Sequence, residues 1–188
     1  MSKATDIVLI GGSAGSYNLI LDIMEALPVF FTSAIIVVIH RNPKYTTKIE
    51  ETLSSRLNRT IIQAGDKTDI EPGRIYFAVP GYHLLIEPDS TFSLDLSERV
   101  QFSRPSIDVL FETASDVYAT HCTAFLLSGA NQDGTDGIHR VKHMGGKAIV
   151  QSPEDALISI MPEHAIQANK EIDIFTDAQI ISFFRHLK

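Results

Sequence analysis

A serine flanked by glycines follows the first apolar run of this chain. Residues 11–15 read Gly-Gly-Ser-Ala-Gly, directly after the apolar residues 7–10 and before a segment with helical periodicity. In a sharp turn between a strand and a helix, the hydroxyl of Ser13 stands clear of the sheet, beside backbone N–H groups that can bind an oxyanion. Similar turns also bind phosphates at the N-terminus of the following helix. The turn therefore indicates either a serine nucleophile or a phosphate site.

Two more polar side chains follow apolar runs that are predicted to be buried strands. His40 comes directly after residues 34–39, and Asp133 lies in the glycine-containing loop after residues 125–127. In doubly wound α/β proteins, ligands bind where the carboxyl ends of parallel strands meet at one edge of the sheet. A serine hydroxyl needs a histidine as base, and the base needs a carboxylate to orient it. The sequence thus predicts Ser13 as nucleophile, His40 as general base and Asp133 as orienting acid.

A parallel sheet is needed to bring these side chains together. The chain alternates between strand-like and helical segments, which is the pattern of a parallel sheet. Apolar, strand-like runs alternate with segments whose apolar residues recur at helical spacing. The predicted strands are residues 7–10, 34–39, 60–63, 123–127 and 147–151, and the predicted helices are residues 17–27, 46–57, 106–118, 134–144, 162–168 and 177–187. We therefore expect an α/β fold with a doubly wound, mostly parallel sheet and helices on both faces.

The middle of the chain departs from that alternation. Residues 74–79, 83–87 and 91–96 are short strand-like runs separated by Pro-Gly and Pro-Asp turns. Short strands joined by tight turns predict a small antiparallel β excursion near residues 74–96. No repeat or linker divides the sequence, so we expect residues 1–188 to form one domain.

The composition excludes several classes of partner. The net charge is −7, whereas non-specific binding of nucleic acid needs a basic surface. No apolar run is long enough to cross a bilayer and the N-terminal residues lack a signal peptide, so we expect no membrane insertion. The single cysteine, Cys122, cannot form an internal disulfide, and its place in an apolar run indicates a small buried residue. Together these features favour a cytoplasmic protein.

The candidate residues also have structural interpretations. Ser13 is suited to cap the following helix, and Asp133 to form a turn within its loop. Asp136 competes with Asp133 for the carboxylate role, but we place Asp136 in the first turn of the next helix. His139 and His143 have the four-residue spacing of metal ligands, yet no glutamate lies between them, which favours a solvated helix face.

The order of the candidates along the chain, Ser-His-Asp, differs from the Ser-Asp-His order of α/β-hydrolases. The sequence instead resembles the catalytic domain of CheB, the family of chemotaxis protein-glutamate methylesterases, which are α/β serine hydrolases. The resemblance covers nearly the whole chain, and it rests on several motifs in the same order. They are residues 10–15, 37–40, 79–84, 103–111, 127–134, 151–156 and 161–162.

The resemblance implies roles for individual residues. Carried over by position, the nucleophile is Ser13, the base is His40 and the orienting acid is Asp133. The backbone near Ala14 and at Ala130 would supply the oxyanion donors, although the family usually has methionine at the position of Ala130. The implied reaction is hydrolysis of glutamyl methyl esters on chemoreceptors or receptor-like signalling proteins, with release of methanol and without a metal or organic cofactor. Some members of the family also deamidate receptor glutamines.

Three features depart from the family pattern. Ser16 follows Gly15 where a second glycine is common, and residues 41–45 (Arg-Asn-Pro-Lys-Tyr) replace a proline-rich segment. Six residues precede the first strand, which leaves no room for the receiver domain that controls the familiar chemotaxis enzyme. We therefore expect a stand-alone enzyme controlled by a separate regulatory domain or kinase, or else a domain from a larger protein.

Two other functions are alternatives. The first is a non-catalytic CheB-like module that binds a receptor or kinase without turnover, and the intact set of Ser13, His40 and Asp133 counts against it. The second is a nucleotide- or phosphate-binding domain that uses residues 11–16 and the next helix N-terminus. The spacing of those glycines misses the Gly-x-Gly-x-x-Gly fingerprint, which disfavours this second alternative.

Overall fold

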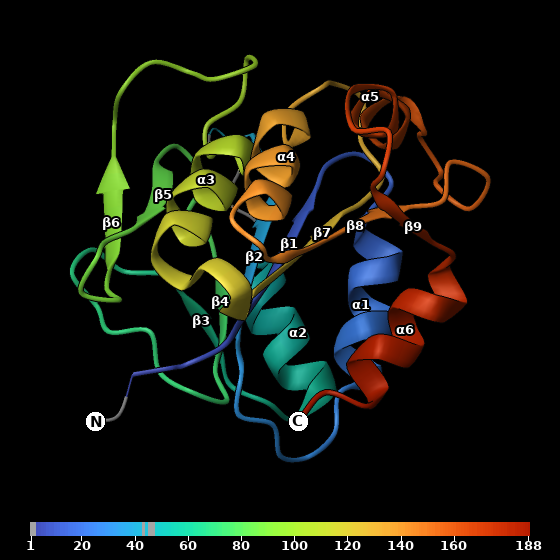
Figure 1. Cartoon of the computed structure of the whole chain (residues 1–188). Coiled ribbons are helices and arrows are strands. Elements are labelled where there is room, and N and C mark those ends of the chain that lie inside the picture. The colour runs from blue at the N-terminus through green and yellow to red at the C-terminus, as the bar shows by residue number, and fades with distance from the viewer. Residues whose placement is uncertain (1–2, 43, 45–47) are drawn as a thin grey trace.

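Strands and helices alternate along the chain in the computed structural model, which describes residues 3–42, 44 and 48–188. Seven strands form one parallel sheet in the order β3-β4-β2-β1-β7-β8-β9 (Figure 1). Their bounds are β1 (Ile7–Gly12), β2 (Ala34–Ile39), β3 (Ile61–Gln63), β4 (Ile75–Phe77), β7 (Cys122–Leu126), β8 (Lys147–Gln151) and β9 (Asp173–Phe175). A separate antiparallel pair consists of β5 (His83–Ile86) and β6 (Phe92–Asp95). The predicted α/β fold class is confirmed.

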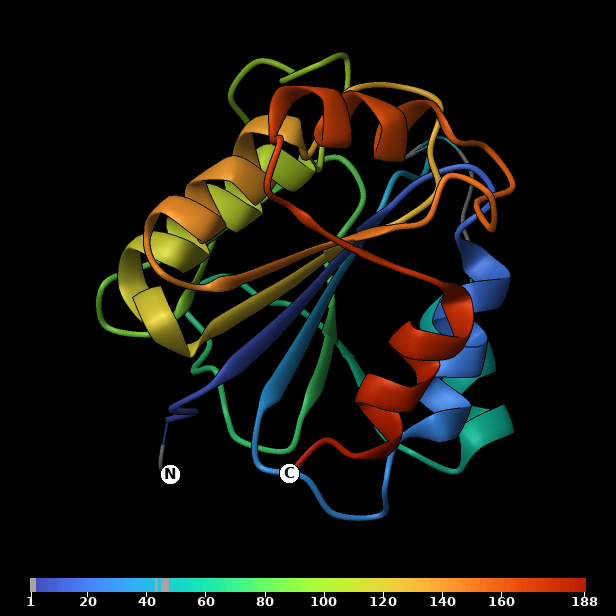
Figure 2. The same cartoon turned by 45° about the vertical axis from the view of Figure 1, so that its right-hand side comes forward.

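Helices cover both faces of the sheet (Figures 1 and 2). One face carries α3 (Ile107–Tyr118), α4 (Thr135–His143) and α5 (Ile160–Ala168), and the other carries α1 (Tyr17–Ala26), α2 (Ile49–Leu57) and α6 (Asp177–Arg185). Strand β1 contributes to both cores, with Ile7 and Leu9 in the first and Val8 and Ile10 in the second. Alternate side chains of a strand point to opposite faces, so a strand covered on both sides is apolar throughout.

The direction of winding reverses between β1 and β7. From β1 the chain passes through α1 to β2 on one side, whereas β7, on the other side of β1, leads through α4 to β8. Because α1 and α4 cover opposite faces, the two loops diverge at the carboxyl ends of β1 and β7. Such a switch point leaves a crevice in which doubly wound proteins bind their ligands. Ser13 follows β1 at this point.

Two sequence-based expectations need correction, and a third falls partly outside the described residues. The sequence assigns residues 74–79 to the antiparallel excursion, but β4 lies in the parallel sheet between β3 and β2, so the excursion is limited to β5 and β6. A short apolar run before a turn has the same sequence pattern in a parallel and in an antiparallel sheet. The pattern does not reveal which strand the run pairs with, because that strand is distant in sequence. Strand β9 was not predicted, since its short edge segment is mostly exposed. Helix α2 begins at Ile49, and residues 46 and 47 of its predicted span lie outside the described residues.

The remaining predicted strands and helices are present, with ends that differ by at most two residues. None of the described helices has the length and apolar character needed to cross a bilayer.

Candidate active site

Ser13 lies in a turn that is held by hydrogen bonds to Ser128 and to Ser16. Its N–H donates to the carbonyl of Ser128, just after β7 (2.9 Å), and its carbonyl accepts hydrogen bonds from the N–H and Oγ of Ser16 (3.1 and 2.7 Å). Gly15 has a φ of 87°, a left-handed conformation that favours glycine. The Ser13 hydroxyl makes no hydrogen bond within the described chain. The N-cap residue of α1 is Ser16, so the capping interpretation of Ser13 is wrong.

His40 lies next to Ser13 because their strands are neighbours. Gly12 pairs with Ile39 in the β1–β2 register, and the N–H of His40 donates to the carbonyl of Gly12 (3.2 Å). The imidazole is 14% exposed, and its Nε2 lies 2.7 Å from Oδ2 of Asp133. An ionised carboxylate only accepts hydrogen bonds, so Nε2 carries the ring proton. This leaves Nδ1 of His40 as the nitrogen that can accept a proton.

Asp133 is buried at the N-terminus of α3. Its carboxylate accepts hydrogen bonds from Oγ of Ser106 (2.7 Å), from the N–H groups of Ile107 and Asp108 (2.8 and 3.1 Å) and from His40. Burial alone would raise the pKa of Asp133, but these hydrogen bonds, above all that from His40, hold the pKa below its ordinary value. The positive end of the α3 dipole acts in the same direction. Asp133 is therefore ionised beside His40 at neutral pH.

A second carboxyl group, that of Asp108, is buried close to Asp133. Its Oδ1 accepts a hydrogen bond from the N–H of Gly137 in α4 (2.7 Å). Burial, reinforced by the charge of Asp133, raises the pKa of Asp108 to about 7. Asp136 is exposed in the first turn of α4, as the sequence predicted. Of these three carboxyl groups, that of Asp133 is hydrogen-bonded to His40.

Nδ1 of His40 has a second serine as its neighbour. Oγ of the buried Ser103 lies 3.4 Å from Nδ1, which is a long hydrogen bond. No hydrogen bond joins Ser13 to His40 in the part of the chain that the structure describes. The fold thus pairs His40 with Asp133 and brings Ser13 to the adjacent strand end without pairing it. Contacts between a nucleophile and its base are often loose before substrate binds.

The main-chain N–H groups of Ala14 and Ala130 have no hydrogen-bond partner among the described residues. By contrast, the N–H of Gly129 donates to the carbonyl of Ile158 (3.1 Å). A Cβ atom on Gly129 would lie 3.1 Å from Cβ of Ser13, so Gly129 packs directly against the serine. The N–H groups of Ala14 and Ala130 are therefore left without a partner among the described residues, as the predicted oxyanion role requires.

The sequence did not reveal the role of Ser128, which connects the turn at Ser13 to the loop that contains Ile158. Its buried Oγ lies within hydrogen-bond distance of the carbonyls of Ala14 (2.9 Å) and Ile158 (3.1 Å) and accepts a hydrogen bond from the N–H of Ile158 (2.9 Å). Its N–H donates to Oε1 of Gln151 at the end of β8 (2.7 Å). A serine in a glycine loop gives no sequence signal for such contacts, because every partner is distant in the chain.

His83 is a second residue that helps to position Asp133 and that the sequence did not reveal. It is fully buried in β5, its Nδ1 accepts a hydrogen bond from the N–H of Ser106 (3.2 Å), and its Nε2 donates to the carbonyl of Glu98 (2.9 Å). His83 therefore holds the residue that caps α3, and Ser106 in turn holds Asp133. The predicted placement of Ser106 at the helix N-terminus is confirmed, but its contact with Asp133 depends on packing.

The other sequence candidates lie outside this cluster. Nδ1 of His139 is 2.7 Å from Oδ1 of Asn169, and its ring stacks on that of His143. Among the described residues, no group of three or more histidine, cysteine, aspartate or glutamate side chains is placed to hold a metal ion. Cys122 is fully buried and burial raises the pKa of its thiol to about 12, so its interpretation as a core residue is confirmed.

A cavity of about 410 Å³ opens beside His40. Residues 40–42 and Lys44 line it on one side, and Arg99 and residues 102–104 line it on the other. A larger cavity of about 500 Å³, between the end of β9 and α6, contains none of the residues described above. The cavity lies next to His40, the candidate base, and is large enough to receive part of a substrate.

These features define a class of protein. A doubly wound α/β fold that gathers a serine, a histidine–aspartate pair and unpaired N–H groups at its switch point has the arrangement of serine hydrolases. The chain belongs to the CheB methylesterase family, whose model matches residues 8–183. The resemblance seen in the sequence is thereby confirmed.

Individual relatives agree with this assignment. The chain is 42% identical over 180 residues to a candidate protein-glutamate methylesterase/protein-glutamine glutaminase of Leptospira interrogans, a match that covers 96% of this chain and 93% of that protein. It is 32% identical over 164 residues to the protein-glutamate methylesterase/protein-glutamine glutaminase of Thermotoga maritima, covering 86% of this chain but 48% of that protein. The crystal structure of the Thermotoga maritima CheB methylesterase catalytic domain matches with a TM-score of 0.87 and 29% identity, over 97% of this chain and 100% of that one.

Proposed function

We propose that this protein hydrolyses γ-methyl esters of glutamate in a protein substrate and releases methanol. The observation that carries the proposal is the 2.7 Å contact between His40 and Asp133 at the strand end next to Ser13. The names of the relatives, protein-glutamate methylesterases, support the choice of substrate. From the chemotaxis family we further propose that the substrates are chemoreceptors or receptor-like signalling proteins, and that the reaction takes place in the cytoplasm.

In the first half of the proposed reaction, Oγ of Ser13 attacks the ester carbonyl carbon while Nδ1 of His40 accepts the hydroxyl proton. Asp133 stabilises the imidazolium that results. The carbonyl oxygen becomes an oxyanion bound by the N–H groups of Ala14 and Ala130, and each such donor is typically worth about 3 kcal/mol in the transition state. Collapse of the intermediate breaks the bond to the methoxy oxygen, which takes the proton from His40 and leaves as methanol. The glutamyl group stays on Ser13.

In the second half, a water molecule attacks the acyl-enzyme. His40 accepts a proton from the water, and the same N–H groups bind the second oxyanion. The ester bond to Oγ then breaks, and Ser13 recovers its proton from His40. The product is a free glutamic acid side chain, which ionises and releases one proton to solvent, so each turnover converts one neutral ester into one negative charge on the substrate.

A second activity, deamidation of glutamine, is favoured by the relatives' names, which include protein-glutamine glutaminase. A glutamine amide presents the same carbonyl with nitrogen as the leaving group, and His40 would protonate that nitrogen as ammonia departs. We propose this activity for the same residues. It is tested by ammonia release from a peptide in which glutamine replaces the methyl-esterified glutamate.

Methanol release from a methyl-esterified receptor and from a peptide with one glutamate γ-methyl ester tests the proposed function. We expect Ser13→Ala to lower turnover by about 10⁴-fold or more. Ser55→Ala, which changes an exposed serine on α2, is the matched control and should retain full turnover. A fluorophosphonate probe should label the wild type and Ser55→Ala but not Ser13→Ala.

The combined outcomes distinguish the alternatives. Labelling of Ser13 without turnover of either ester would mean a serine hydrolase with a different substrate. No labelling and no turnover would contradict the proposal and favour the non-catalytic module. A phosphate-binding function has no use for a hydrogen-bonded histidine–aspartate pair, and it would appear as binding of inorganic phosphate that competes with neither ester.

A further inference from the structure

An unusual turn borders the cavity beside His40. The Phe102 turn (residues 100–103) is closed by two backbone hydrogen bonds between Val100 and Ser103 (3.2 and 2.8 Å). Both central residues have left-handed backbones, with φ of 46° at Gln101 and 64° at Phe102. Two-residue turns of this kind favour asparagine and glycine, because a bulky side chain at positive φ costs roughly 1 kcal/mol. The aromatic side chain at Phe102 therefore opposes the local preference of the backbone.

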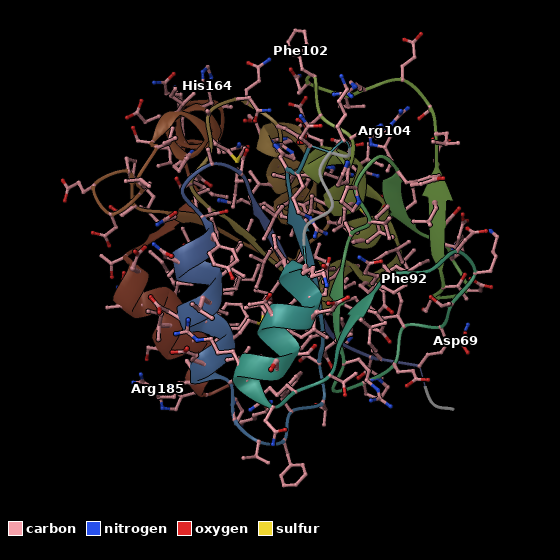
Figure 3. The ribbon with its side chains drawn as sticks, turned by 180° about the vertical axis from the view of Figure 1, so that it is seen from behind. Asp69, Phe92, Phe102, Arg104, His164 and Arg185 are labelled. Atoms are coloured by element: carbon pink, nitrogen blue, oxygen red, sulfur yellow. The ribbon has the colours of Figure 1, made fainter. Side chains whose placement is uncertain are left out.

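The side chain of Phe102 is not packed in the protein interior. Phe102 is 89% exposed and projects from one end of the molecule (Figure 3). An aromatic residue that is both strained and exposed contributes nothing evident to folding. Exposed aromatic side chains of this kind are typical anchors in protein–protein contacts.

Side-chain contacts connect the Phe102 turn to the candidate active site. Oγ of Ser103 lies 3.4 Å from Nδ1 of His40 and accepts a hydrogen bond from the side-chain amide of Asn131 (3.1 Å). The amide of Gln132 donates to Oε1 of Gln101 (2.7 Å). The turn is thus held by the loop that carries Asp133, so whatever Phe102 contacts lies within reach of the catalytic edge.

The cavity between the turn and His40 is basic, in a chain whose net charge is −7. Among the described residues, its lining includes four cationic side chains and no carboxylate. Arg41 is bound to the buried Glu50 (2.6 Å), and Arg104 donates to the carbonyls of Leu96 and Ser97, so these two cations also shape the rim. Arg99 and Lys44 are exposed, and Arg99 donates a long hydrogen bond to the carbonyl of Phe102 (3.3 Å), so its charge lies beside the Phe102 turn, where it can approach a bound partner. A concentrated positive rim on an acidic protein is suited to an acidic partner.

We infer that the Phe102 turn and the basic rim formed by Lys44 and Arg99 dock the protein substrate through an acidic segment next to the esterified glutamate. This inference rests on the proposed function and adds a recognition surface to it. Phe102 contacts apolar side chains of the substrate, while Lys44 and Arg99 pair with carboxylates that flank the ester. The partner is a polypeptide, because the reacting ester is carried on a protein and the chain as a whole repels polyanions of the nucleic-acid type.

Three substrates test the inference: 4-nitrophenyl acetate, a peptide with one glutamate γ-methyl ester flanked by glutamates, and the same peptide flanked by glutamines. We expect the wild type to prefer the acidic peptide, with a preference that shrinks as salt rises. Arg99→Gln should lower kcat/KM on the acidic peptide about threefold, as expected for an exposed charge pair, mainly through KM. Phe102→Gly should lower it about tenfold on both peptides. For each variant, the fold loss of kcat/KM on the acidic peptide should be at least three times any fold loss of kcat/KM on 4-nitrophenyl acetate.

A stability measurement separates docking from a structural role. Phe102→Gly removes the strain at positive φ, so its melting temperature should equal or exceed that of the wild type while peptide turnover falls. Arg185→Gln removes an exposed arginine at the opposite end of the molecule (Figure 3) and is the matched control, with no expected change on any substrate.

The inference is overturned if Phe102→Gly lowers the melting temperature, or if Arg99→Gln affects both peptides and 4-nitrophenyl acetate equally. If the wild type hydrolyses none of the three esters, the proposed function fails and the docking surface fails with it. If the wild type hydrolyses all three but shows no preference for the acidic peptide, the docking inference alone fails.

Discussion

Nε2 of His40 lies 2.7 Å from Oδ2 of Asp133, and this contact leaves Nδ1 as the ring nitrogen that can accept a proton. The carboxylate is in turn held by Ser106 and by two N–H groups in the first turn of α3. His40 is therefore oriented by a helix N-terminus through an intervening carboxylate. In such an arrangement the aspartate fixes the tautomer of the histidine as well as its position.

Replacing the carboxylate by an amide tests that role. Asp133→Asn keeps one acceptor oxygen. If that oxygen faces Asp108, the NH₂ group faces His40 and Ile107; if it faces His40 and Ile107, it no longer carries the charge. We expect kcat for ester hydrolysis to fall by about 10⁴-fold, because Nδ1 is then protonated or the imidazolium loses its counterion. Asp136→Asn, the exposed neighbour in α4, is the control and should keep wild-type kcat. Retention of more than a tenth of wild-type kcat in Asp133→Asn would remove Asp133 from the mechanism.

The proposed donor at Ala130 can be removed without touching a side-chain function. Ala130→Pro deletes the N–H, and the preceding Gly129 imposes little restriction on the new ring. We expect kcat to fall about 10²-fold or more, the usual effect of losing one oxyanion donor. Ala130→Met, which introduces the residue usual in the family, retains the N–H and should keep kcat within severalfold. Equal losses in both variants would point to packing instead of the N–H group.

Gly129 separates Ser13 from Met161, and its substitution should displace the nucleophile. A Cβ at Gly129 would lie 2.8 Å from Sδ of Met161 and 3.1 Å from Cβ of Ser13. Because the methionine end is flexible, we expect Gly129→Ala to cost only about 1 kcal/mol of stability, but to lower kcat at least tenfold through Ser13. The double variant Gly129→Ala, Met161→Ala relieves the contact with methionine. Full recovery of kcat there would show that Ser13 is not displaced directly.

The buried carboxyl of Asp108 makes stability depend on pH. Its pKa is raised from 3.8 to about 7 in the folded protein, mainly by burial. The folded state therefore binds a proton between pH 4 and 7 that the unfolded chain releases, so the wild type loses stability as pH rises through this range. Asp108→Asn keeps the acceptor for Gly137 and cannot ionise.

Urea unfolding of wild type and Asp108→Asn at a series of pH values measures this effect. The two proteins should have similar free energies of unfolding near pH 4. The variant should become progressively more stable than the wild type up to pH 7, by as much as about 4 kcal/mol for the full shift. Loss of charge on Asp133 at low pH affects both proteins alike and cancels in the difference. A difference that does not change with pH would mean that the pKa of Asp108 is the same in the folded and unfolded states.

Local sequence patterns were enough to predict the elements that carry the candidate residues. The apolar run before His40 is buried on both faces of the sheet, and such a run has the same signature wherever its neighbours lie. The turn at Ser13 and the loop at Asp133 follow strands, so the rule that strand ends share an edge was sufficient to group all three. Strand β4 shows the limit of this reasoning, since its short run predicts a strand but not which strand it pairs with.

The sequence by itself therefore determined which residue types stand at the carboxyl edge of the sheet. Only the tertiary structure decided that Nε2 of His40 faces Asp133, that α3 and its N-cap residue Ser106 supply three of the hydrogen bonds to that carboxylate, and that Ser128 hydrogen-bonds to the turn that carries Ser13. Hydrophobic periodicity is a property of neighbouring residues and can be read locally. Hydrogen bonds between residues tens of positions apart exist only after the helices have packed on the sheet, because it is the packing that brings the donors and acceptors within reach.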